Sequence, residues 1–137
     1  MNIMESAIIG VLGLSIAIGI YILATDDHIY EHAPSHAYTL MAFVGADAVL
    51  LGLLKFHNNL ARKGIMILAI VQFVAMNLDI FTTETIPFFQ VEGLGFDELL
   101  EHLYGSWYFD LLLIAQAALI ALSIVSMRYD AKVLLRH

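Results

Sequence analysis

The chain lacks cysteine and is poor in charged residues, and both shortages limit what it can be. With no cysteine, disulfides, thiolate zinc sites, iron–sulfur clusters and cysteine nucleophiles are excluded. Only 14% of the 137 residues are charged and 61% are hydrophobic, whereas a soluble domain carries about 25% charged and about 45–50% apolar residues. So little polar surface cannot cover a water-soluble globule, and we expect the lipid bilayer to surround this chain.

Positive charge and catalytic motifs are also scarce. The chain has 6 Lys and Arg against 13 Asp and Glu, a formal net charge of -7, which argues against nucleic acid as a partner because the phosphates would be repelled. It contains no glycine-rich phosphate loop, no G-x-S-x-G elbow and no haem-attaching C-x-x-C-H. We therefore predict no catalytic centre and no cofactor, and expect a non-catalytic protein more than an enzyme.

Four apolar runs are long enough to cross the hydrocarbon of a membrane as helices: 5–24, 37–56, 64–83 and 107–127. A spanning helix needs about 20 apolar residues, and the alternation typical of a β-barrel is missing. The sequence therefore predicts an all-α integral membrane protein, a single four-helix domain over residues 1–137. Before the last run, Phe96, Leu99, Leu100 and Leu103 form one stripe, which predicts a short interfacial helix over residues 96–104.

The distribution of basic residues predicts an orientation. All six lie in or beside the 57–63 connection or after the last run: Lys55, Arg62, Lys63, Arg128, Lys132 and Arg136. Basic residues collect in cytoplasmic loops, so we expect both termini in the cytoplasm of a multi-pass plasma-membrane protein. The outer face would then carry eight of the 13 acids: Asp26, Asp27, Glu31, Glu84, Glu92, Asp97, Glu98 and Glu101.

Small residues recur at helical spacing in three of the four runs. They are Ser6, Gly10, Gly13 and Ala17 in the first, Ala42, Gly45 and Gly52 in the second, and Ala117, Ala118 and Ala121 in the fourth. In lipid, helices associate where small residues let their backbones approach closely. These faces predict contacts between helices of this chain or with other membrane subunits, for which the outer loop 84–106 is a second candidate surface.

Polar side chains inside the apolar runs are candidates for function. Asp47 lies near the middle of the second run, Asp79 and Asp110 lie in the outer parts of the third and fourth, and Gln72 shares a stripe with Asp79. A carboxylate at the centre of a bilayer costs about 2.5–3.5 kcal/mol on insertion scales. One hypothesis is a proton or cation relay that begins at Asp47. The alternative is that these groups bond to other helices and support assembly.

Histidines and acids cluster in the first outer loop, which reads DDHIYEHAPSH. His28, His32 and His36 are candidate metal ligands, because imidazole and carboxylate groups suit Zn²⁺ or Cu²⁺. His28 to His32 also matches the H-x-x-E-H string of some metallopeptidases. The short loop and Pro34 argue against a peptidase helix, so we expect a peripheral metal site or solvated histidines.

Three functions remain open from these features. The first is an accessory or structural subunit of a multi-subunit membrane complex, without a catalytic centre. The second is a small homo-oligomeric proton- or cation-coupled transporter or channel that uses Asp47 and Asp79. The third is a membrane electron-transfer or metal protein with an outer histidine site. The chain is similar to small multidrug transporters in size, but those carry their essential glutamate within the first helix, where this chain has only Glu5 at the inner end.

In layout and general sequence character, the whole chain resembles the small accessory subunits of archaeal-type membrane oxidoreductases, such as ammonia monooxygenase or terminal oxidase complexes. The copper subunit of the membrane monooxygenases carries an Asp-x3-His ligand pair on a transmembrane helix. Here Asp47, Asp79 and Asp110 are followed four positions later by Leu51, Thr83 and Ile114. The resemblance therefore implies a supporting subunit of an oxidoreductase complex, not its metal-bearing one.

Overall fold

The computed structural model describes residues 3–56, 58–87, 98, 101 and 105–134, and these contain four long helices and no strand. The helices are α1 (Ile3–Thr25), α3 (Pro34–Leu54), α4 (Asn58–Thr85) and α6 (Trp107–Leu134), with a short α2 (Asp27–Glu31) after α1. All four contain a segment apolar enough to cross a membrane, namely Ile3–Thr25, Pro34–Leu54, Asn59–Asp79 and Trp107–Tyr129. The shortest segments have 21 residues, which is about 31 Å of helix and matches the bilayer core.

Each predicted run falls within one of these helices, except that 37–56 extends two residues past the end of α3 at Leu54. The all-helical class with four potential spans is thus confirmed. Most of the predicted interfacial helix over 96–104 lies outside the described residues, so that helix stays a prediction.

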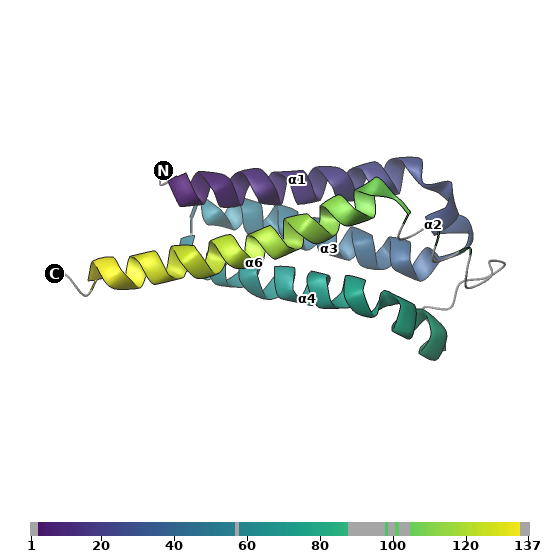
Figure 1. Cartoon of the computed structure of the whole chain (residues 1–137). Coiled ribbons are helices and arrows are strands. Elements are labelled where there is room, and N and C mark those ends of the chain that lie inside the picture. The colour runs from purple at the N-terminus through teal and green to yellow at the C-terminus, as the bar shows by residue number, and fades with distance from the viewer. Residues whose placement is uncertain (1–2, 57, 88–97, 99–100, 102–104, 135–137) are drawn as a thin grey trace.

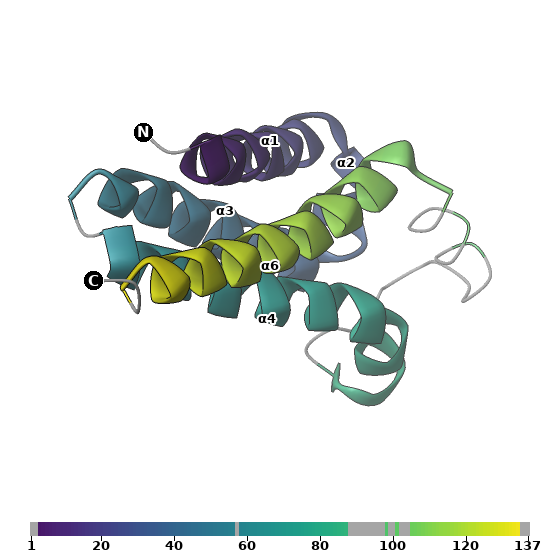
Figure 2. The ribbon, with the colours of Figure 1, turned by 60° about the vertical axis from the view of Figure 1, so that its left-hand side comes forward.

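The four long helices run alternately up and down (Figure 1) and close into a ring. Each packs against its two neighbours, in the order α1, α3, α4, α6 and back to α1. The two chain termini lie at one end of the bundle, here called the terminal end. The opposite or far end carries α2, the end of α4 and the start of α6, and a view rotated by 60° shows the same arrangement (Figure 2).

Local signals explain the break between α1 and α3 at the far end. The Asp26 side chain accepts a hydrogen bond of 3.1 Å from the backbone N–H of His28 and so caps α2. The hydroxyl of Tyr30 donates to the carbonyl of Leu23 at 2.7 Å, which satisfies an acceptor in the last turns of α1. Pro34 then occupies the first turn of α3, where its missing N–H costs nothing.

The apolar core has two parts. The larger part, in the terminal half, consists of Ile8, Leu12, Leu54, Ala61, Ile65, Ala69 and Leu119. A smaller part in the far half consists of Ile18, Ile22 and Leu112. Along α1 the buried Ser15 separates the two parts, and along α6 the buried Gln116 does the same. The two apolar parts of the core are therefore separated by polar side chains near the centre of the bundle.

The glycines divide into those that pack inside the bundle and those that face outward. A Cβ on Gly19 would overlap the Cγ2 of Val44, and one on Gly64 would lie 2.7 Å from the Cδ2 of Leu50. By contrast, a Cβ on any of four glycines of α1 and α3 would meet nothing within 4 Å: Gly10, Gly13, Gly45 and Gly52. The small-residue faces predicted for the first and second runs therefore lie on the outside of the bundle.

Candidate functional site

Four buried polar side chains, one from each long helix, meet at the centre of the bundle. They are Ser15 from α1, Asp47 from α3, Gln72 from α4 and Gln116 from α6, and none is more than 3% exposed. We call these four residues the central polar layer. Because polar groups at this depth cannot reach water, each needs a partner within the protein.

Hydrogen bonds join the layer across three of the four sides of the ring. The Nε2 of Gln116 donates to the Oγ of Ser15 at 2.8 Å, and this hydroxyl donates to the Oδ2 of Asp47 at 3.3 Å. The Nε2 of Gln72 lies 3.1 Å from both carboxylate oxygens of Asp47. The chain of contacts thus runs from α6 through α1 to α3 and ends on α4.

The Asp47 carboxyl group is surrounded by neutral groups. Its donors are a hydroxyl and an amide, and no basic side chain in the described part of the chain forms a salt bridge with it. The closest basic residue along α3 is Lys55, eight residues later and about 12 Å away along the helix axis. Within the described residues, three hydrogen bonds and no basic side chain therefore stabilise this carboxyl group.

One polar atom of the layer receives no hydrogen bond from the described residues. The Oε1 of Gln116 is buried and has no hydrogen-bond partner among the described residues, although the other atom of the same amide bonds to Ser15. A buried acceptor without a partner is costly. When Asp47 is ionised, the Oε1 of Gln116 is therefore an acceptor in the layer that receives no hydrogen bond from a described residue.

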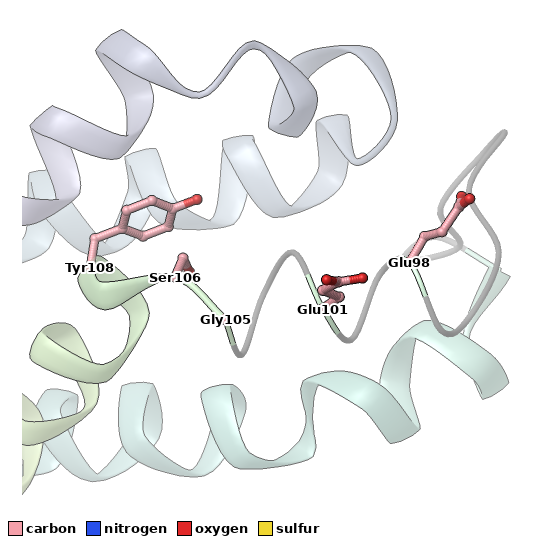
Figure 3. Close-up of a pocket in the computed structure, with 5 residues that line it drawn as sticks. All are labelled: Glu98, Glu101, Gly105, Ser106 and Tyr108. Carbon is pink, nitrogen blue, oxygen red and sulfur yellow. The ribbon is translucent and has the colours of Figure 1, made fainter.

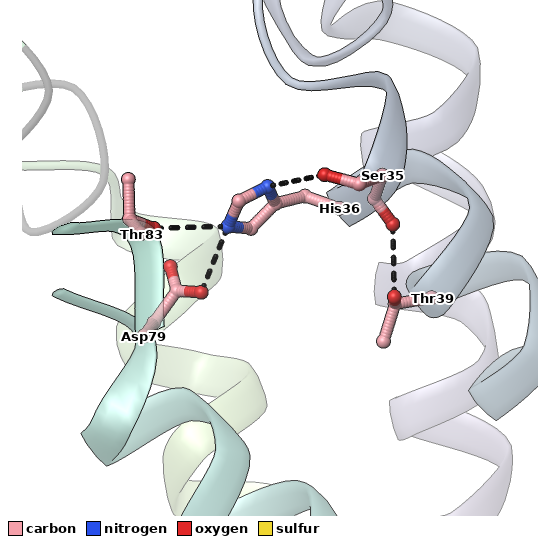
Figure 4. Close-up of polar contacts among 5 residues, drawn as sticks. All are labelled: Ser35, His36, Thr39, Asp79 and Thr83. Atoms are coloured by element: carbon pink, nitrogen blue, oxygen red, sulfur yellow. Dashed lines mark hydrogen bonds and ion pairs between the residues drawn. The ribbon is translucent and has the colours of Figure 1, made fainter. Parts of the chain in front are cut away.

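A second polar cluster lies near the far end of the bundle, between α3 and α4 (Figure 4). The Nε2 of His36 is 2.9 Å from the Oδ1 of Asp79 and 3.3 Å from the Oγ1 of Thr83. The Nδ1 of His36 is 3.4 Å from the Oγ of Ser35. In the tautomer protonated at Nε2, this nitrogen donates to the carboxylate and Nδ1 accepts from the serine hydroxyl. This cluster ties the beginning of α3 to the last turns of α4.

We expect the pair of His36 and Asp79 to stabilise the bundle, since both side chains are largely buried, with 14% and 16% exposed. In a double-mutant cycle of His36→Leu and Asp79→Leu, the coupling in unfolding free energy should be about 0.5–3 kcal/mol. Unfolding of the detergent-solubilised protein by SDS measures it. As a control, His36→Leu combined with Asn77→Leu should show almost no coupling, because Asn77 is exposed and bonds to the carbonyl of Phe73 in its own helix. A cycle that gives no more coupling than this control would contradict the expectation.

The three histidines of the metal hypothesis do not converge. His28 and His32 stack on α2 with their ring centroids 5.6 Å apart, whereas His36 contacts Asp79 on another helix. No group of three His, Asp or Glu side chains within the described residues is arranged to hold a metal ion. His102 lies outside those residues, and metal binding at the histidines stays a prediction.

The remaining candidate acid, Asp110, is exposed in the first turn of α6. It takes no part in the central polar layer. Its neighbour Tyr108 does make a contact across the bundle, because its hydroxyl donates to the Oδ2 of Asp26 at 2.9 Å and so ties α6 to the cap of α2. Sequence reasoning did not identify this link.

A shallow hollow lies where the chain enters α6 (Figure 3), lined by Glu98, Glu101, Gly105, Ser106 and Tyr108. Gly105 is required here, because a Cβ would lie 2.5 Å from the carbonyl oxygen of Glu101, which accepts the Gly105 N–H at 3.0 Å. Both glutamates are exposed, so the hollow is open and acidic.

The structure places the four predicted intramembrane polar residues in three locations. Asp47 and Gln72 belong to the central polar layer and bond directly, whereas Asp79 belongs to the His36 cluster and Asp110 to the surface. Along α4, Gln72 and Asp79 are about 10 Å apart. Ser15 and Gln116 complete the layer and were not among the predicted site residues.

Comparison of the chain with protein-family models, with curated proteins and with solved structures finds no match.

Proposed function

We propose that this chain is an accessory subunit of a larger membrane complex and has no catalytic centre of its own. The observation that carries the proposal is the outward position of small residues on α1 and α3. Ser6, Gly10 and Ala17 on α1 are exposed, as are Ala42, Gly45 and Gly52 on α3. The bundle leaves these small-residue faces uncovered.

Glycine facing lipid gives up the contacts that a larger apolar side chain would make. Small residues at steps of three and four are instead typical of surfaces where a second helix packs closely. The same chain uses Gly19 and Gly64 for close packing within the bundle. We infer that Gly10, Gly13, Gly45 and Gly52 do the same with helices of another subunit.

The complex that fits best is a membrane oxidoreductase, on the strength of the layout resemblance alone. In this reading the central polar layer fixes the alignment of the four helices. Its hydrogen bonds are made within one chain, as a scaffold requires. The loop 84–106 is proposed as a second contact with the complex.

The mass of the native particle tests this proposal. Native membranes are solubilised gently, and the particle that contains this chain is isolated and weighed by native mass spectrometry, with its subunits identified. We expect a hetero-complex several times larger than the 15.2 kDa chain. A lone monomer or homo-oligomer of this chain would overturn the proposal and favour the transporter or channel that sequence analysis also allows.

We also propose that the terminal end faces the cytoplasm, since the basic residues Lys55, Arg62 and Lys63 lie there. The absence of native cysteine makes a direct test simple. In intact cells, Ala33→Cys at the far end should react with a membrane-impermeant maleimide, whereas Asn59→Cys should react only after permeabilisation. The unmodified chain is the blank. The opposite labelling pattern would show the reverse orientation.

A further inference from the structure

We propose that the central polar layer is a proton-binding site, in which Asp47 takes up a proton and Ser15 and Gln116 form the hydrogen-bond chain that accommodates it. This inference is independent of the proposed role as an accessory subunit. It rests on the geometry of four side chains and on one buried acceptor that the present hydrogen bonds leave unused.

Among the described residues, no basic side chain compensates the charge of an ionised Asp47. Asp47 is 3% exposed, it lies near the middle of α3, and its bonding partners within the described residues are the neutral Ser15 and Gln72. An ionised carboxyl group in such a place is tolerated only if something neutralises or solvates it. A proton on the carboxyl group removes the charge without any further side chain.

The hydrogen bonds that join Gln116, Ser15 and Asp47 can run in either direction. With Asp47 ionised, Gln116 donates to Ser15 and Ser15 donates to Asp47. When a proton from water binds at Oδ2, the new O–H can donate to the Oγ of Ser15, and the serine proton must turn to another acceptor. The unused Oε1 of Gln116 is that acceptor once its amide rotates by half a turn and exchanges Oε1 with Nε2. Both hydrogen bonds, between Asp47 and Ser15 and between Ser15 and Gln116, then persist with donor and acceptor exchanged.

The hydrogen bond between Ser15 and Asp47 is long. The contact from the Oγ of Ser15 to the Oδ2 of Asp47 is 3.3 Å, whereas O–H···O bonds are most often about 2.7–2.8 Å. The contact is thus long for a hydroxyl that donates to an ionised carboxylate, for which about 2.5–2.7 Å is usual, and it can shorten when the carboxylic acid of Asp47 becomes the donor. The Nε2 of Gln72 remains close to Oδ1 at 3.1 Å and donates to this oxygen in both states.

A metal cation fits the same layer less well than a proton. The amide of Gln72 lies against both oxygens of Asp47, at 3.1 Å from each. It thus occupies the edge where a cation would bind between the oxygens, and its donor hydrogens would repel one. A proton needs only one lone pair of Oδ2. Proton binding is therefore the form of charge compensation that leaves the packing unchanged.

Among the described residues, no other titratable side chain lies at this level of the bundle. The neighbours from α1, α4 and α6 are a serine and two glutamines. Along the helices, the nearest titratable residues are Tyr21 on α1, Lys55 on α3, Asp79 on α4 and Asp110 on α6. All are six or more residues from the layer, about 9 Å or more of helix rise. His36, on the same helix as Asp47, is farther away and contacts Asp79. Proton uptake in the layer therefore belongs to Asp47.

Infrared spectroscopy of the full chain in lipid vesicles tests the proposal. Difference spectra are recorded as the pH is lowered from alkaline to acidic, with and without ¹³C-labelled aspartate. We expect one carboxylic-acid band that appears on acidification, shifts with the label, moves in position in Asp47→Glu and is lost in Asp47→Asn. In Gln72→Leu the band should shift to higher frequency, because the carbonyl oxygen loses its donor. Asp110→Asn, at an exposed position, should leave the band unchanged.

Three results would overturn the proposal. The first is the absence of any titrating band that responds to Asp47→Glu. Because this variant keeps a carboxyl group, the result does not depend on whether the Asp47→Asn variant folds. The second is a Gln116→Leu variant with the same band position as the wild-type chain, since Gln116 would then take no part. The third is a band that disappears when Na⁺ is added at constant pH, which would assign the layer to a metal cation.

Discussion

Replacing Gln72 by leucine is expected to lower the free energy of unfolding by about 1–3 kcal/mol, the range for leaving a buried polar group without its partner. Gln72 is 3% exposed, and its amide is the only described donor that lies against both oxygens of Asp47. Leucine has a similar volume and keeps the apolar contacts, so the loss measures the hydrogen bonds. Reversible unfolding in SDS-containing mixed micelles, followed by circular dichroism, gives the value.

Two further variants separate this effect from a general response to substitution. Asn77→Leu lies on the same helix but at an exposed position, so it should change stability very little. The double variant Asp47→Leu with Gln72→Leu should be more stable than Gln72→Leu alone, because removing both partners leaves no buried carboxyl group without its donors. If Gln72→Leu costs no more than Asn77→Leu, the central polar layer does not hold the bundle together.

The sequence was sufficient for the helices because hydropathy alone determines which segments can cross a membrane. The run 64–83, for example, lies inside α4, and the run 107–127 lies inside α6. The ends of the helices were less predictable. α3 begins at Pro34, three residues before the predicted run, since proline favours a first helical turn whatever the hydropathy of its neighbours.

The central polar layer was only half predictable. Asp47 stood out because a charge in the middle of an apolar run is rare, but Ser15 and Gln116 carry no charge and did not. The positions of Ser15 and Gln116 along their spans were nevertheless informative. The four spans have midpoints at residues 14, 44, 69 and 118, and each member of the layer lies within about three residues of one of them. In an up-and-down bundle, polar residues near the midpoints lie at the same depth.

Pairing between helices was not predictable from spacing along one helix. Gln72 and Asp79 share a stripe of α4, which suggested a common role, yet Gln72 bonds to α3 at the centre and Asp79 bonds to α3 near the far end. Likewise His36 was grouped with His28 and His32 because they are close in sequence. Their separation follows from Pro34, which starts a new helix and places His36 on α3, opposite α4.

Replacing the outward glycines by leucine is expected to release this chain from its complex without unfolding it. Gly10 and Gly45 have no atom within 4 Å of an added Cβ, so Gly10→Leu and Gly45→Leu are tolerated within the bundle, and leucine also favours helix more than glycine does. At a closely packed contact with another helix, the extra volume costs about 1–3 kcal/mol. That cost corresponds to association weakened by roughly 5- to 150-fold, measured as the fraction of chain that co-purifies with the native particle.

Ala117→Leu serves as the comparison, because Ala117 is an exposed member of the third predicted small-residue face, on α6, whereas the proposal assigns the contact to α1 and α3. Circular dichroism and unfolding in SDS should show all three variants as stable as the wild-type chain. Association should fall in Gly10→Leu and Gly45→Leu and should persist in Ala117→Leu. Loss of association in Ala117→Leu alone would move the contact to α6 and contradict the assignment to α1 and α3. Full association in all three would show that lipid covers these glycines, because a closely packed subunit could not accommodate leucine at both positions.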